Sequence, residues 1–393
     1  MSWLTSLKAT VAKAFDTTPS GSEWQRVYAE CQSLIDQAKF QEALVVAKRV
    51  VERAHRDVGI NHTASALSVA QLATVLLNLG DLAQAQALFL QALNILEQCG
   101  NPEDPVIANC LMSYGCLLIM KGQSDGAELL VERALAIREK AFGSNHSQVA
   151  ECLDAIARFK MSRREFAEAE PILKQALTIK ESTLGMAHPQ VAVGLAGLAQ
   201  LYKAQGKLDD ADQLYQSAIL TWGSAFSPEH PQIGQWADAL ASIYVEQQQF
   251  DKAEAMFNVA LAIWEKGPVP FHQHIVPALC GLARLLTKQT RYEEAIALYA
   301  RVVDLAKQVF GPIHKDVALY LGALGAAYIT RGDFEQAISV FKESLMVSEG
   351  VTGSSHLDVA VALDRLAAAC QKAGKPSEAD DFAKRAAAIR EGC

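Results

Sequence analysis

The chain has 393 residues, half of them apolar and a fifth charged, with a formal net charge of −8. A mildly acidic chain without a run of Lys and Arg does not favour a nucleic-acid groove or a polybasic membrane patch. No apolar stretch approaches about 18 residues and the amino end lacks a signal-peptide layout. We therefore expect a cytoplasmic protein with no integral membrane segment and no nucleic-acid partner. Its eight cysteines form no CxxC pair, which fits a reducing compartment.

Residues 1–22 predict an amphipathic helix followed by a linker. The helix would have one apolar face, made by Trp3, Leu4, Leu7, Val11, Ala14 and Phe15. The polar stretch at residues 16–22 predicts a flexible joint. Three roles remain open for this segment: an end cap on the helices after residue 22, a tail docked in a groove of its own or a neighbouring subunit, or a weak membrane-surface helix. The second role would allow self-association through this segment.

From residue 23 to residue 393 the chain repeats with a period of 42 residues. Alanine recurs in this register at Ala43, Ala85, Ala127, Ala169, Ala211, Ala253, Ala295, Ala337 and Ala379. Such a period indicates one unit copied nine times and stacked on its neighbours. Each unit predicts a helical hairpin, as in the second repeat, where residues 65–79 and 82–97 have helical periodicity and Gly80 breaks it.

The residues at the turn inside each hairpin and at the crossing of its two helices also recur every 42 residues. A glycine stands at the break in five repeats, and the other four have Ala38, Arg164, Gln248 and Thr290, where we expect more backbone strain. A small residue precedes each recurrent alanine by twelve positions, which predicts a close crossing of the two helices. A large residue follows the alanine by four positions, often an aromatic: Phe89, Tyr215, Phe257, Tyr299 and Phe341.

The sequence of leucine, small residue, Gly-Asp or Gly-Lys, then alanine, aromatic and alanine resembles the tetratricopeptide repeat, whose usual period is about 34. The extra residues carry a Gly-x-x-His signature that ends at His146, His188, His314 and His356. This combination resembles the kinesin-light-chain type of array. The resemblance implies an all-α, right-handed superhelical solenoid of nine hairpins. It also implies a non-catalytic scaffold or adaptor without a cofactor, which binds a protein or peptide partner.

Seven histidines are spaced by multiples of 42: His62, His146, His188, His230, His272, His314 and His356. One imidazole per hairpin cannot converge on a metal ion, so we expect no metal site. A helix N-cap is the favoured role, because Asp104, a good N-cap residue, takes this place in the third repeat.

Trp222 and Trp264 are one period apart, where other repeats have Arg138, Lys180 or Arg390, which we expect to be solvated. The tryptophans either form an exposed recognition patch or pack on the long connectors that come after them. Packing is favoured, because large aromatic side chains seldom stay exposed.

The concave surface of such arrays is lined by the first helix of each hairpin, and the resemblance therefore gives a candidate groove. Its amino-terminal part would be apolar and adaptable, with Leu67, Leu77, Met112, Cys116 and Met120. Its later part would have charges of both signs, with Asp154, Arg158, Gln200, Lys203, Asp238, Arg284 and Lys288. The paired asparagines that grip a peptide backbone in the kinesin-light-chain family are missing, for example at Ala70 and Gln71, so that family's cargo specificity is not carried over.

No nucleophile–base pair, phosphate loop or HExxH motif occurs, and Glu151, Asp154 and Arg158 are interpreted as a charge set within one helix. The expected function is a non-catalytic scaffold that binds a peptide, helix or protein segment. The alternatives are a regulatory peptide sensor and a self-assembling scaffold subunit. A non-catalytic subunit of an enzyme complex is less favoured.

Overall fold

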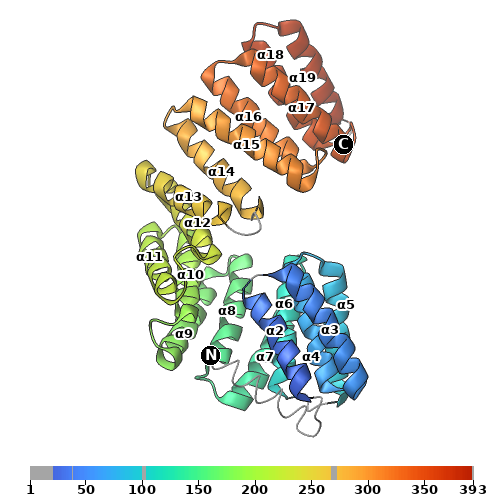
Figure 1. Ribbon diagram of the computed structural model, residues 1–393. Coiled ribbons are helices and arrows are strands. Elements are labelled where there is room, and N and C mark those ends of the chain that lie inside the picture. Colours follow the sequence, from blue (N-terminus) through green and yellow to red (C-terminus); the bar gives the residue numbers. More distant parts are fainter. Residues whose placement is uncertain (1–20, 38, 100–102, 267–271, 392–393) are drawn as a thin grey trace. The chain divides into compact units, whose positions relative to one another are not determined.

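The computed structural model describes residues 21–37, 39–99, 103–266 and 272–391, which form helices joined by short turns and contain no strand (Figure 1). The chain divides into two compact units, residues 1–205 and 206–393. The first unit contains α2 (Gly21–Asp36), α3 (Phe40–Val58), α4 (Thr63–Asn78), α5 (Leu82–Cys99), α6 (Pro105–Met120), α7 (Ser124–Phe142), α8 (Ser147–Ser162), α9 (Phe166–Leu184) and α10 (Pro189–Ala204). The second contains α11 (Leu208–Ala225), α12 (Pro231–Glu246), α13 (Phe250–Glu265), α14 (His272–Lys288), α15 (Tyr292–Phe310), α16 (Lys315–Arg331), α17 (Phe334–Thr352), α18 (Leu357–Lys372) and α19 (Pro376–Glu391).

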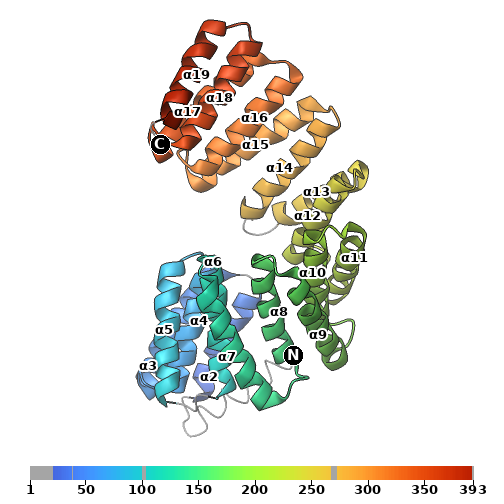
Figure 2. The same ribbon diagram turned by 180° about the vertical axis from the view of Figure 1, so that it is seen from behind.

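Within each unit, a helix packs mainly against the helices before and after it in the chain. In the second unit, α14 to α19 follow one another in chain order in both views (Figures 1 and 2). Even-numbered helices are the first helices of their hairpins, and neighbouring first helices such as α4 and α6 also touch. Contacts limited to near neighbours define a solenoid, so the expected all-α solenoid of helical hairpins is confirmed.

The recurrent alanines are buried, as expected for residues at a helix crossing. Eight of them are fully buried and Ala379 is 7% exposed. In the third repeat, a Cβ added to Gly115 would lie 3.5 Å from the carbonyl oxygen of Ala127 and 3.1 Å from Val131. Gly115, twelve positions before Ala127, therefore packs directly against the helical turn that contains this alanine, as the spacing predicts. The five aromatic residues four positions after the alanine are also buried.

The breaks between paired helices have the expected backbone. The glycines at this position have positive φ, and the three described replacements take the same conformation, with φ of 63° at Arg164, 60° at Gln248 and 64° at Thr290. Side chains are disfavoured there, by roughly 1–3 kcal/mol for a strained residue. The expected strain at these three turns is confirmed, and Ala38 lies outside the described residues.

The periodic histidines cap the first helices. In six repeats the imidazole Nδ1 accepts a hydrogen bond from the backbone N–H two residues later, at 3.1 to 3.3 Å, from His62, His146, His188, His230, His314 and His356. Asp104 does the same in the third repeat, at 2.9 Å. The capping interpretation is confirmed for these residues, while the side chain of His272 lies outside those described.

The two tryptophans are packing residues. Trp264 is 2% exposed, stacks on His274 and lies so close to Gly234 that an added Cβ would be 2.7 Å from its indole nitrogen. Trp222 is half-buried, with ring centroids of Phe226 and Trp236 at 4.9 and 5.4 Å. Packing on the connector is therefore confirmed for Trp222, through Phe226. Trp264 is also a packing residue, but most of the connector after it lies outside the described residues.

The predicted amphipathic helix of residues 1–15 lies outside the described residues, as does the linker up to residue 20. The surface between α2 and α3, where the described chain begins, is charged. It contains a cavity of about 190 Å³ lined by Glu23, Val27, Arg49, Glu52, Arg53 and Arg56. No described helix is both long and apolar enough to cross a membrane.

Replacing Ala253 by leucine should lower the free energy of unfolding by roughly 1–3 kcal/mol, because the added volume has no space at the helix crossing. Ala253 is fully buried, whereas Ala262 on the same helix is exposed. Ala262→Leu is thus the matched control and should change stability by less than about 0.5 kcal/mol. Urea unfolding measures both, and equal effects of the two variants would contradict the placement of the crossing.

Acid should weaken the caps, because a protonated imidazole has no lone pair to accept the backbone N–H. Burial lowers the pKa of His146, His188 and His230, and Arg138 lowers that of His146 further, against a smaller opposite effect of Glu151. The stability that these caps supply is complete above the unfolded-state pKa of about 6.5 and is lost as pH falls through the lower folded-state values.

A variant with His146, His188 and His230 all changed to asparagine keeps an N-cap acceptor that does not titrate. Between about pH 7 and about pH 5.5 its free energy of unfolding should fall less than that of the wild type. Parallel urea titrations at the two pH values measure the difference. An identical loss in both proteins would show that the caps do not carry the pH dependence.

Candidate functional site

The exposed faces of the first helices carry part of the predicted groove. In the first unit, Arg158 and Gln200 are exposed and Met120 is 60% exposed. The side chains of Leu77, Met112, Cys116 and Lys203 are half-buried. Leu67 is only 5% exposed and belongs to the core, so it does not line a surface. In the second unit, Arg284 and Lys288 are exposed and Asp238 is half-buried.

Two acidic residues of α8, Asp154 and Glu151, are paired with basic residues of neighbouring helices. Asp154 of α8 forms an ion pair with Lys180 of α9, whose side chain is 2% exposed. Glu151 of α8 lies 3.2 Å from the guanidinium of Arg138 in α7. The interpretation of Glu151, Asp154 and Arg158 as a charge set within one helix was therefore wrong, because both carboxylates turn toward cations on other helices.

The buried cations also correct a second expectation. Arg138 is 3% exposed and donates to the Gln148 carbonyl oxygen at 2.6 Å and to the Asn109 side chain at 2.9 Å. Lys180 is 1% exposed. Both were expected to be solvated, as Arg390 of the last repeat partly is. A buried cation is stable only beside a negative charge. Arg138 therefore pairs with Glu151 and Lys180 with Asp154, and both carboxylates belong to α8.

The remaining acidic residues near the end of α8 are paired as well. Lys160 contacts Glu165 and Glu168, and Arg163 contacts Glu128. Glu170 accepts a hydrogen bond from Lys174 at 2.7 Å, and chiefly this bond lowers its pKa to about 2. Two cations of the same region, Arg158 and Arg164, form no ion pair with any side chain in the described part of the chain.

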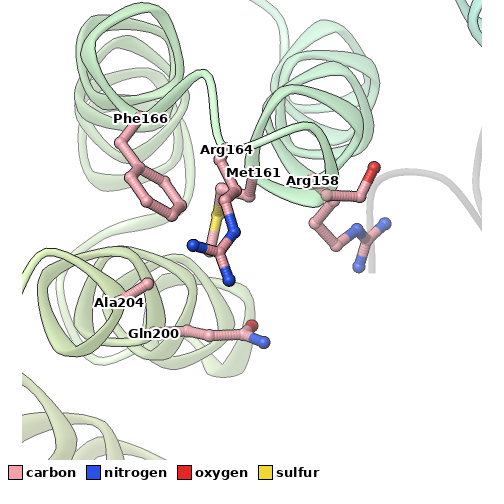
Figure 3. Close-up of a pocket in the computed structure, with 7 residues that line it drawn as sticks. Arg158, Met161, Arg164, Phe166, Gln200 and Ala204 are labelled. Carbon is pink, nitrogen blue, oxygen red and sulfur yellow. The ribbon is translucent and has the colours of Figure 1, made fainter.

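These two arginines border one cavity of about 540 Å³ at the ends of α8 and α10. Its lining comes from α8, from the turn after it, from the start of α9 and from α10: Arg158, Met161, Ser162, Arg164, Phe166, Gln200 and Ala204. In Figure 3 the side chains of Arg164 and Gln200 extend toward each other, and the ring of Phe166 faces Ala204. The cavity thus combines two guanidinium groups and an amide with an apolar wall.

At this cavity the structure brings together two of the predicted groove residues, Arg158 and Gln200. It adds Arg164 and Phe166, which the groove prediction missed because they come after the first helix instead of lying on it. One signal in the sequence pointed to Arg164: it stands where most repeats have a small or polar residue, usually glycine. No group of three or more potential metal ligands occurs among the described residues.

Removing one partner of the Lys180–Asp154 pair should be costly. Lys180→Met leaves the half-buried Asp154 carboxylate without its cation and should lower the free energy of unfolding by roughly 3 kcal/mol. Lys174→Met, which breaks the exposed pair with Glu170, should cost less than about 1 kcal/mol. Adding Asp154→Leu to Lys180→Met should recover most of the loss. Urea unfolding of the four proteins tests the order, and equal effects of the two single variants would contradict the burial argument.

Solved structures of low sequence identity are similar to this chain. BtubC (BKLC) from P. vanneervenii is 19% identical, with a TM-score of 0.49 over 58% of this chain and 91% of its own. The kinesin-light-chain repeats of Podospora anserina are 24% identical, with a TM-score of 0.45 over 52% and 96%. A STAND signal-transduction ATPase from Pyrococcus horikoshii is 15% identical, with a TM-score of 0.64; the match spans 88% of this chain and 52% of that protein.

No curated protein sequence matches the chain. The family model described as tetratricopeptide repeat matches residues 62–140, 149–219, 190–266, 275–347 and 331–392. These matches overlap along most of the repeat region and agree with the hairpins, the buried alanine period and the turn positions. The chain therefore belongs to the tetratricopeptide repeat family.

Proposed function

We propose that this protein is a non-catalytic scaffold whose exposed first-helix faces bind a segment of a partner protein, in extended or helical form. Tetratricopeptide repeats generally mediate protein–protein interaction, and that supports the class of function. The observation that carries the proposal is the cavity at α8 and α10. There, Arg158 and Arg164 have no ion-pair partner within the described chain, while the neighbouring carboxylates do.

The partner segment should bring negative charge and an apolar side chain. The sequence suggested a surface of mixed sign, but Asp154 and Glu151 are neutralised by the cations beneath them. In the second unit, Arg284 and Lys288 are exposed and have no ion-pair partner among the described residues. Both units therefore present unpaired positive charge on first helices, and electrostatic complementarity would speed association with an acidic segment.

A regulatory sensor is a second candidate. The similar array of the Pyrococcus horikoshii protein is named as the sensor of a larger signal-transduction ATPase, of which this chain spans 52%. In a sensor, the same first-helix faces would bind the signal. The two candidates differ in whether binding changes the activity of another domain or partner.

Charge reversal on the first helices should remove the partner. We expect Arg158→Glu with Arg284→Glu to reduce capture of the bound protein at least tenfold. The matched control is Lys48→Glu with Lys384→Glu, which makes the same change in net charge at exposed positions of the second helices α3 and α19. Quantitative affinity capture from native lysate compares the three proteins. Hydrogen exchange with the captured partner should show protection of α8 and α10.

Unchanged capture by the first-helix variant would exclude these faces as the binding surface. Loss in the control variant alone would move the binding surface to the second helices.

A further inference from the structure

We propose that the cavity between α8 and α10 recognises a phosphorylated side chain on the partner segment, so that phosphorylation controls binding. This inference rests on the proposed function and adds the chemistry of one contact. The cavity has the size of a site for a small ligand group, at about 540 Å³, and opens beside the exposed face of α8.

The charge inventory around the cavity favours a dianion. The five acidic side chains of α8 and the first residues of α9 all have basic partners: Glu151, Asp154, Glu165, Glu168 and Glu170. Arg158 and Arg164 have none in the described chain. Among the described residues, two positive charges therefore border the cavity without an acidic partner. A phosphate monoester supplies about −1.5 to −2 at neutral pH, whereas a carboxylate supplies only −1.

The donors around the cavity also match phosphate geometry. Each guanidinium is a planar fork that can bind two oxygens, and the Gln200 amide adds another donor from α10. A phosphate group offers three terminal oxygens to such donors. Phe166, Met161 and Ala204 form an apolar wall that would contact the carbon atoms next to the phosphate.

Arg164 is held in a conformation that disfavours it. Its φ of 63° matches that of Gly80, Gly122 and Gly206 at the same position of other repeats. Glycine takes this backbone without the steric cost that a Cβ brings. The arginine is thus the poorer residue for the turn, and its guanidinium is placed at the cavity. Arg164→Gly separates the role of residue 164 in the turn from that of its guanidinium in the cavity. The variant should keep the turn and remove one of the two cations.

The test uses the full chain and three pools of nine-residue peptides that differ only at a fixed central position: phosphoserine, serine or glutamate. We expect the phosphoserine pool to retain the wild-type protein at least tenfold better than either of the other pools. Arg158→Gln and Arg164→Gly should each remove most of this preference. Arg26→Gln is the matched control at an exposed arginine of α2 and should keep it. Urea unfolding should show that Arg164→Gly is at least as stable as the wild type, because glycine relieves the backbone strain.

Three results would overturn the proposal. If the glutamate pool binds as well as the phosphoserine pool and both depend on Arg158, the cavity recognises carboxylates, and the proposed function stands without phosphate control. If Arg164→Gly retains the phosphoserine preference, the cavity is not the phosphate site. If a single-stranded oligouridylate binds with dependence on Arg158 and Arg164 while no peptide pool does, the phosphate belongs to a nucleic acid, and the proposed protein partner fails with it.

Discussion

The close crossing of the two helices in each hairpin is the contact on which the rest of this structure depends. In the third repeat the buried Ala127 of the second helix packs against Gly115 of the first, where an added Cβ would lie 3.5 Å from the Ala127 carbonyl oxygen. This approach leaves one side of each first helix without a cover from its own hairpin. The exposed positions Arg158, Gln200 and Arg284 all result from it. The packing contact thus determines which residues face outward, and the proposed function depends on those residues.

The net charge of the exposed surface of α8 depends on the buried residues beneath it. Arg138 and Lys180 are almost fully buried, and a buried cation is stable only with a carboxylate close by. The carboxylates that satisfy them, Glu151 and Asp154, come from the exposed face of α8. The charge left on that face is positive, although the protein as a whole has a net charge of −8. Local pairing therefore outweighs overall composition in setting the charge of this surface.

Periodicity alone predicted the hairpins, the buried alanines, the strained turns and the histidine caps, because each of these is a contact within one repeat. The cavity was only partly predictable, since it joins residues of three helices and one turn. Arg158 and Gln200 could be placed from the repeat register, but Phe166 and Arg164 required the actual path of the chain. The burial of Lys180 could not be inferred either, because a lysine near a helix end can point into solvent or beneath its neighbour with equal ease.

The position eleven residues after the recurrent alanine has a consequence for how such an array can change over time. It is filled by Arg138, Lys180, Trp222 and Trp264 in four successive repeats. Arg138 pairs with Glu151 of the next repeat, and Trp264 stacks on His274 of the next repeat. Loss or duplication of one 42-residue unit would keep every helix in phase and still bring unsuited neighbours together. The repeats share one backbone pattern, but each has side chains suited to its own neighbours. The number and order of the repeats are therefore constrained by the residue pairs between them.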